Sequence, residues 1–182
     1  METVELALPE VRLLRPNVYE DERGYFSMTF SARDFGQLGL PAAFVQHNLS
    51  RSRRGTLRGV HYQLQHSQGK LVRCVHGQVF DVAVDLRRSS PTAGRWVGQH
   101  LTDERPELLW IPPGFGHGFY VLSEWADVAY DVTDYYSPEA ERTVRWDDPT
   151  LGIEWPLAAN EPPLLSAKDS AGVSYDQAEL YD

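Results

Sequence analysis

Cysteine is almost absent from this sequence: Cys74 is the single cysteine among 182 residues. One thiol cannot form an internal disulfide or a cysteine-based zinc site, which excludes a secreted disulfide scaffold and favours a reducing compartment. No run approaches the ~18 apolar residues of a membrane span. The first residues, 1–5, lack the basic-then-apolar order of a signal peptide. We therefore expect a cytoplasmic protein that has no membrane partner.

Basic charge is also scarce, since 17 Lys and Arg stand against 26 Asp and Glu, for a formal net charge of -9. Duplex DNA would be repelled, and no nucleic-acid-binding motif accompanies the few bases, so we expect no nucleic-acid partner. One segment reverses this balance. Between Asp34 and Asp81 there is no carboxylate, and four of the six histidines lie there. Bases interleaved with histidines and glycines indicate a pocket for a small anion, phosphate being the natural candidate.

Aromatic residues are plentiful, at 12%, and the length is that of one ordinary domain, so we expect a single domain over residues 1–182. Short alternating segments bounded by Gly, Pro and Asp or Asn predict an all-β sandwich or barrel. Ser31 is placed to cap a short helix that ends before Gly39. The link His76-Gly77-Gln78 predicts a hairpin turn. The nine predicted strands are 24–30, 44–50, 56–63, 70–75, 79–86, 95–101, 107–111, 118–122 and 126–133.

The segment Thr56–Gln63 carries polar residues that a barrel interior could use to hold a ligand. Strict alternation would put Arg58 and His61 on opposite faces. Gly59 between them could host a bulge that turns both side chains inward. Beyond residue 138 the periodicity fades, which predicts an irregular tail that wraps the barrel and is anchored by Trp146 and Trp155.

Part of the sequence resembles the cupin superfamily, because Pro112-x-Gly114-x-x-His117 is similar to the second half of its signature. The resemblance implies a double-stranded β-helix, or jelly-roll barrel. Metal-binding cupins need a second histidine two residues after the first and then a glutamate. Here His61 is followed by Tyr62 and Gln63, and a metal centre needs three or four donors. We therefore expect no metal and no cofactor.

A closer resemblance runs from Val11 to Tyr175 and is to the dTDP-4-dehydrorhamnose 3,5-epimerase family of nucleotide-sugar enzymes. It implies an all-β, cupin-type jelly roll with short peripheral helices and an irregular C-terminal tail. It also implies an isomerase that inverts C3, C5 or both on a dTDP-4-keto-6-deoxyhexose, without separating these three. The motifs that carry the resemblance include Asp21-Glu22-Arg23-Gly24, Gln46-His47-Asn48, Leu57-Arg58-Gly59-Val60-His61-Tyr62-Gln63, Gly69-Lys70, Gly116-His117-Gly118-Phe119, Asp134-Tyr135-Tyr136-Ser137-Pro138 and Lys168-Asp169.

The resemblance implies four catalytic residues. His61 matches the base that removes a proton beside the ketone, and an imidazole with a pKa of about 6.5 suits that role near neutral pH. Asp169 matches the acid that orients the ring and stabilises its cation. Tyr130 matches a tyrosine across the sugar that can deliver a proton to the far face. Lys70 would stabilise the enolate charge on O4.

The same resemblance implies the substrate-binding residues and a homodimer. Arg23 and Arg58 match diphosphate contacts, and Arg23 would reach in from a neighbouring subunit. One departure affects the base: many relatives carry an aromatic residue and then a glutamate after Gly24-Tyr25-Phe26, whereas this chain reads Ser27-Met28. A methionine is a weak hydrogen-bond acceptor, which puts base selectivity in question. The remaining implied substrate contacts are Gln46 and Asn48 to the sugar nucleotide, Tyr136 beside the thymidine, and His117, whose role is structural or chemical.

Two other classes of function remain as alternatives. A non-catalytic nucleotide-sugar-binding jelly roll would need the arginines and Tyr136 but not His61, and the combination of His61, Tyr130 and Asp169 argues against it. A metal-dependent cupin enzyme is disfavoured by Gln63 at the expected ligand position.

Overall fold

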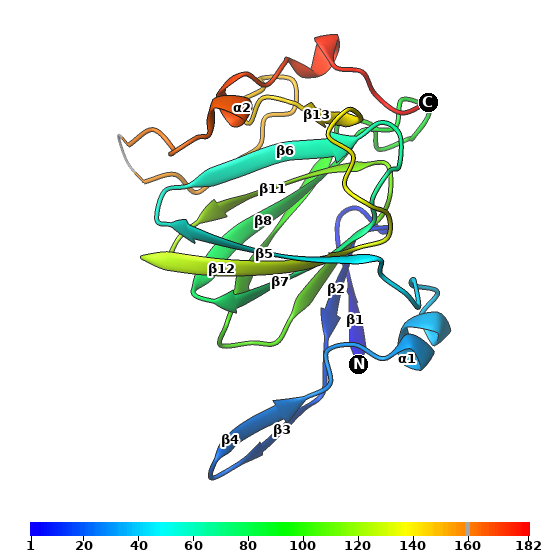
Figure 1. Ribbon diagram of the computed structural model, residues 1–182, viewed down its shortest axis with the longest axis vertical. Coiled ribbons are helices and arrows are strands. Elements are labelled where there is room, and N and C mark those ends of the chain that lie inside the picture. Colours follow the sequence, from blue (N-terminus) through cyan, green and yellow to red (C-terminus); the bar gives the residue numbers. More distant parts are fainter. Residues whose placement is uncertain (159–160) are drawn as a thin grey trace.

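The computed structural model describes residues 1–158 and 161–182, and its core is two antiparallel β-sheets (Figure 1). The six-stranded sheet has the order β1-β2-β10-β7-β12-β5. Its strands are β1 (Glu2–Glu5), β2 (Arg12–Arg15), β10 (Leu108–Ile111), β7 (Lys70–His76), β12 (Trp125–Val132) and β5 (Gln46–Arg53). The five-stranded sheet has the order β13-β6-β11-β8-β9, with β13 (Glu141–Thr143), β6 (Leu57–Gln63), β11 (Phe115–Val121), β8 (Gln78–Asp85) and β9 (Trp96–Thr102).

Apolar side chains from both sheets meet in one cluster between them, which forms the barrel interior. Its members include Val72 and Val128 from the six-stranded sheet and Ala83 and Phe119 from the other, all 4% exposed or less. Burial of this surface, at roughly 25 cal/mol per Å² of apolar area, provides the main stabilisation of such a fold. The predicted all-β jelly-roll architecture is confirmed.

The C-terminal tail covers the outer face of the five-stranded sheet, as predicted (Figure 1). Trp155 is 9% exposed and donates its indole N–H to the carbonyl of Trp146 at 2.8 Å. Both tryptophans pack into a second cluster with Val82 and Val84 of β8 and with Leu86, which follows this strand. The apolar face of β8 therefore points away from the barrel interior and towards the tail.

The helices are short and peripheral. Ser31 caps α1 (Ala32–Gln37), as predicted, because its hydroxyl accepts the Asp34 N–H. The helix buries Phe35 against the six-stranded sheet. Ser166 caps α2 (Ala167–Ser170) in the tail, which also contains a 3-10 turn, η1 (Tyr175–Gln177). Among residues 1–158 and 161–182, no helix is long and apolar enough to cross a membrane.

The structure corrects the predicted hairpin at His76-Gly77-Gln78. β7 pairs with β10 and β12, whereas β8 pairs with β11 and β9, so Gly77 turns a corner between the two sheets. Its positive φ of 78° suits either kind of turn, which is why the local sequence could not separate them. The predicted strand 24–30 is also shorter than expected, since β4 covers Gly24–Ser27.

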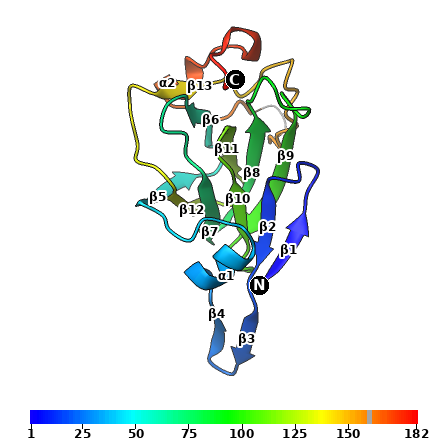
Figure 2. The same ribbon diagram turned by 90° about the vertical axis from the view of Figure 1, so that its right-hand side faces the viewer.

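Strand β4 pairs with β3 (Val18–Asp21) in a hairpin that projects from the barrel (Figure 2). This hairpin makes no ladder with either main sheet. Its aromatic side chains are unusually open to solvent, with Tyr19 62% exposed and Phe26 68% exposed.

The predicted bulge at Gly59 is present in β6. The four residues of β6 from Arg58 to His61 span the same length as the three residues of β11 from His117 to Phe119. The extra residue breaks strict alternation, so that Arg58 and His61 both line one pocket. Gly59 makes this possible because it has a φ of 124° and approaches the backbone of Gly118 closely.

Candidate active site

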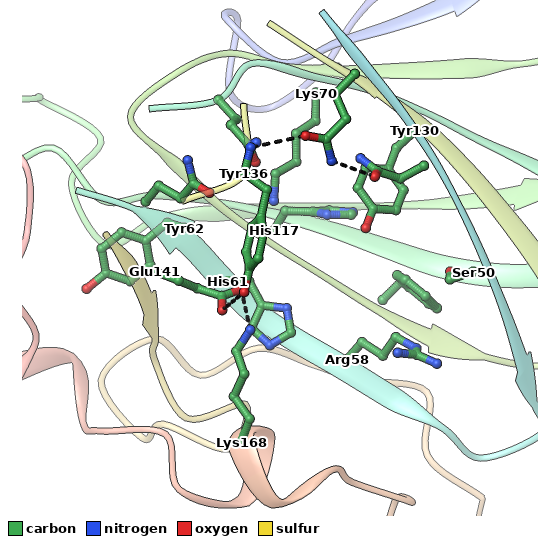
Figure 3. Close-up of a pocket in the computed structure, with 15 residues that line it drawn as sticks. Ser50, Arg58, His61, Tyr62, Lys70, His117, Tyr130, Tyr136, Glu141 and Lys168 are labelled. Atoms are coloured by element: carbon green, nitrogen blue, oxygen red, sulfur yellow. Dashed lines mark hydrogen bonds and ion pairs between the residues drawn. The ribbon is translucent and has the colours of Figure 1, made fainter. Parts of the chain in front are cut away.

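The site is a pocket of about 350 Å³ between strands of the two sheets (Figure 3). Its volume lies within the range of small-molecule sites. Strands of both sheets and the tail contribute to its walls. The lining residues are Gln46, Asn48, Ser50, Arg58, His61, Tyr62, Gln63, Gln68, Lys70, His117, Phe119, Tyr130, Tyr136, Glu141 and Lys168.

His61 and Asp169 form a short hydrogen bond, with 2.6 Å between Nε2 and Oδ1. Asp169 is 3% exposed and also accepts from the Gly59 N–H at 3.1 Å and from the Ser166 hydroxyl at 2.6 Å. Burial opposes ionisation of this carboxyl, yet the hydrogen bonds from His61, Ser166 and Gly59 hold the pKa of Asp169 well below its usual value. The carboxylate therefore accepts the Nε2 proton, which leaves Nδ1 of His61 free to act as a base.

The His61 ring is partly buried, and its pKa is lowered from the ordinary value. Burial is the main cause, and the positive charges of Lys168 and Lys70 act in the same direction. The hydrogen bond to Asp169 opposes them and favours the imidazolium ion. The ring is thus neutral near pH 7, as a base must be, while its cation has a fixed counter-charge.

Lys70 begins β7 and is 8% exposed at the pocket wall. Burial lowers the pKa of its ammonium to about 8, although Asp81 and Glu141 favour the charged form. The side chain is therefore still charged at neutral pH. A buried cation at this place can stabilise negative charge that develops on a bound ligand.

Tyr130 faces the pocket from β12, across from His61 (Figure 3). Burial raises the pKa of its phenol, so the hydroxyl keeps its proton at neutral pH. Its ring lies 6.4 Å from the ring of His117. His117 in turn places Nε2 at 3.0 Å from both carboxylate oxygens of Asp81, which is fully buried. Asp81 thus fixes the orientation of this second imidazole.

The predicted binding residues are held by side-chain contacts of their own. Arg58 donates Nε–H to the Ser52 hydroxyl at 3.0 Å. Gln46 accepts the Tyr136 N–H through Oε1 at 3.1 Å and donates from Nε2 to Asn48 Oδ1 at 2.8 Å. Because Asn48 uses its oxygen in this contact, its amide N–H groups are the ones left for a ligand.

Two predicted site residues do not line this pocket: Asp169, which reaches it through His61, and Arg23, which lies outside the site. Arg23 sits at the end of the β3–β4 hairpin, where its side chain is 85% exposed and pairs with Asp21. The departure at Ser27-Met28 lies on the same segment: the Ser27 hydroxyl donates to the Asn17 carbonyl, and Met28 is 45% exposed. Asp169 bonds to Nε2 of His61, and its own side chain does not line the pocket.

Sequence reasoning missed three charged residues of the site, namely Asp81, Glu141 and Lys168. No local pattern marks Asp81 as a site residue, because the partner it finds in His117 is 36 residues away. Lys168 lies beside Asp169 in the chain, and this adjacency could have signalled it. Glu141 lies on a three-residue edge strand that no hydrophobic pattern marks.

Gln63 has a structural task at the position where metal-binding cupins carry a ligand. Its amide group donates to the carbonyls of His66 and Tyr135 and accepts from the Ser137 N–H, and so it ties two loops together. Within the described part of the chain, no group of three or more His, Cys, Asp or Glu side chains is arranged to hold a metal ion.

Comparisons with known proteins agree with this geometry. The family described as dTDP-4-dehydrorhamnose 3,5-epimerase matches residues 5–177. A protein of that name from Pseudomonas aeruginosa is 51% identical over 182 residues, covering 100% of this chain and 99% of the relative. The structure is similar to a dTDP-6-deoxy-D-glucose-3,5-epimerase from Legionella pneumophila in complex with dTDP-4-keto-L-rhamnose, with 48% identity, a TM-score of 0.94 and coverage of 98% of this chain and 94% of that chain. A Bacillus anthracis enzyme with TDP and PPi bound has 36% identity, a TM-score of 0.90 and coverage of 95% and 98%.

Proposed function

This chain belongs to the dTDP-4-dehydrorhamnose 3,5-epimerase family, and we propose that it is an isomerase that inverts C3 and C5 of a dTDP-4-keto-6-deoxyhexose. The observation that carries the proposal is the His61–Asp169 pair, which presents a free imidazole nitrogen to a pocket lined by Lys70, Tyr130 and Arg58. The three groups supply the cation, the proton donor and the phosphate contact that such a reaction needs.

The ketone at C4 makes the hydrogens on C3 and C5 acidic, because the carbanion delocalises into an enolate. In the proposed mechanism Nδ1 of His61 takes the proton, and Asp169 stabilises the resulting imidazolium ion. The ammonium of Lys70 stabilises the negative charge that gathers on O4. The Tyr130 phenol then returns a proton to the opposite face of the carbon, which completes the inversion.

The remaining pocket residues would bind the nucleotide part of the substrate. The Arg58 guanidinium suits diphosphate oxygens, and its contact with Ser52 holds it at the pocket wall. The Tyr136 ring is 50% exposed beside the pocket, which leaves a face on which a pyrimidine can stack. The free amide N–H groups of Asn48 can donate to sugar or phosphate oxygens.

Deuterium exchange tests this function directly. The protein is incubated with dTDP-4-keto-6-deoxyglucose in D₂O, and NMR locates the label. Label at C3 and C5 with inversion at both carbons is the expected result. Label and inversion at C3 alone, or at C5 alone, would replace the proposal with a single-carbon epimerase. No label at either carbon would indicate a nucleotide-sugar-binding protein.

The charge of Lys70 should set the alkaline limit of activity. The pKa of this buried ammonium is lowered to about 8, so the group loses its proton as the pH rises through that value. We expect kcat/KM to fall above about pH 8 and Lys70→Met to lower it about 10²- to 10³-fold at neutral pH. A pH profile of both proteins checks this. An unchanged wild-type kcat/KM up to pH 9.5 would contradict the role of Lys70.

We also propose that two chains form a homodimer in which Arg23 of each chain reaches the pocket of the other. The exposed aromatic residues of the projecting hairpin support this, because such a surface is normally covered by another protein. Arg23 cannot serve its own pocket from the hairpin's end without a large movement.

Complementation tests the Arg23 proposal. Arg23→Ala is expected to lower kcat/KM at least about tenfold, by loss of a charge-assisted contact to phosphate. Mixing this variant with His61→Ala under subunit exchange should restore about a quarter of the native sites, since each mixed dimer contains one intact site. Sedimentation analysis reports the dimer itself. A mixture no more active than its parts would place Arg23 in the same chain's site or outside it.

A further inference from the structure

An ion pair spans the edge of the pocket between β13 and α2. The Lys168 ammonium contacts Oε1 of Glu141, while Oε2 of the same carboxylate accepts the Tyr136 hydroxyl at 2.8 Å. All three side chains line the pocket (Figure 3). Glu141 is thus engaged at both oxygens, and its side chain is 18% exposed. The mechanism proposed above assigns neither Glu141 nor Lys168 a task.

The backbone connects both members of this pair to the His61–Asp169 pair. Lys168 directly precedes Asp169 in α2, whose first turn is fixed by the Ser166 cap. Glu141 lies two residues from Thr143, which is the register partner of His61. The ion pair therefore clamps α2 against β13 at the place where Asp169 holds the imidazole.

We propose that Glu141 and Lys168 are a pair of positioning residues that holds Asp169 against His61, fixes the Tyr136 ring, and balances the charge around the base. This inference rests on the function proposed above for His61. Although the two side chains form one ion pair, they favour opposite charge states of the imidazole: Glu141 favours the cation and Lys168 the neutral ring.

The charged and titratable surroundings of His61 support opposite effects. Asp169 favours the imidazolium ion, and the charges of Lys168 and Lys70 disfavour it. Burial raises the pKa of Glu141, but the contacts with Lys168 and Tyr136 outweigh it and hold this pKa below its ordinary value. The charge of the His61 cation acts in the same direction, so the Glu141 carboxylate and the imidazolium ion favour each other. The other groups that face His61 are His117, its register partner on β11, Tyr130 on β12, and Arg58 on its own strand. Neither substitution removes any of these three groups.

The test compares Lys168→Met with Glu141→Gln. The acidic limb of kcat/KM reports the pKa of the base in the free enzyme. Removing the Lys168 charge should move this limb to higher pH by about half a unit, and removing the Glu141 charge should move it to lower pH by a similar amount. Lys168→Arg should keep the wild-type limb. Two losses of activity without opposite shifts would leave only a structural contact and overturn the proposal.

Arg142→Met provides a matched control. Arg142 is the next residue of β13, and its guanidinium pairs with Glu179 rather than entering the pocket. The Arg142→Met substitution removes one positive charge from the same strand as Glu141, and we expect no shift of the acidic limb of kcat/KM. A shift as large as that of Lys168→Met would mean that net charge, and not the clamp, controls the base.

NMR titration of the His61 imidazole separates this inference from the proposed function. The resonance is assigned by its loss in His61→Gln, and its midpoint is measured in each variant whether or not turnover occurs. Suppose that the midpoint moves in opposite directions in the two variants while the wild-type protein shows no turnover. That result would support the clamp and refute the proposed enzyme function. Exchange in the wild type together with unshifted midpoints in both variants would retain the enzyme and refute the clamp.

Discussion

His61→Ala is expected to abolish deuterium uptake at both C3 and C5 of the keto sugar. One imidazole nitrogen faces the pocket and serves as the base for either carbon, so its loss removes the first step of both inversions. Positioned proton transfer contributes about 10²- to 10⁴-fold, and exchange should fall by at least this factor. The measurement is the NMR exchange rate at each carbon with equal protein concentrations.

Tyr130→Phe is the matched comparison, because it removes one hydroxyl from the opposite wall and leaves the base in place. Exchange should continue in this variant, since the His61 imidazole can return the proton to the face from which it came. Inversion should be impaired. Full epimerisation by His61→Ala, or equal loss of exchange in both variants, would refute the assignment of the base.

Gly59→Ala is expected to cost about 3 kcal/mol of the free energy of unfolding, from a strained φ together with overpacking. A Cβ atom at this position would lie 2.5 Å from the Gly118 Cα and 2.7 Å from the His117 carbonyl oxygen, both backbone atoms that cannot move aside. The φ of 124° adds strain for any residue with a side chain. Because Arg58 and His61 flank the bulge, the surviving folded protein should also lose catalytic activity.

Gly36→Ala is the control for Gly59→Ala. Gly36 lies in α1, is exposed, and has open space where a Cβ atom would be placed. Alanine there should be neutral or stabilise the protein by about 0.5–1 kcal/mol. Chemical denaturation of the two variants measures both values. A Gly59→Ala protein as stable as the wild type would mean that β6 and β11 can separate at this point without cost.

The polar part of the site could be predicted where the relevant residues share a short segment. Arg58, Gly59 and His61 stand within four residues, so a bulge that turns both side chains inward followed from alternation and the properties of glycine. The partners of His61 and His117 could not be found in this way. Asp169 and Asp81 lie 108 and 36 residues from them, and only the family resemblance indicated the first of these.

The corner at Gly77 shows the limit of local signals for the fold. A glycine with positive φ between two strands predicts a change of direction but does not determine which strand becomes the neighbour. That choice depends on the burial of Val79 and Ala83 between the sheets, a property of the whole barrel. The projecting hairpin was incompletely predicted for a related reason: its aromatic rings Tyr19 and Phe26 lie beside each other, with centroids 6.5 Å apart, and the hairpin forms no ladder with either main sheet.

The last segment of the chain, which supplies Asp169, has a consequence for the order of events during synthesis. The strands of both sheets precede residue 144. All of them can therefore leave the ribosome before the carboxylate that pairs with His61 has emerged. Such a nascent chain has the imidazole without its counter-charge. Competence for chemistry is thus acquired only once Asp169 has been synthesised and the tail has packed against the five-stranded sheet.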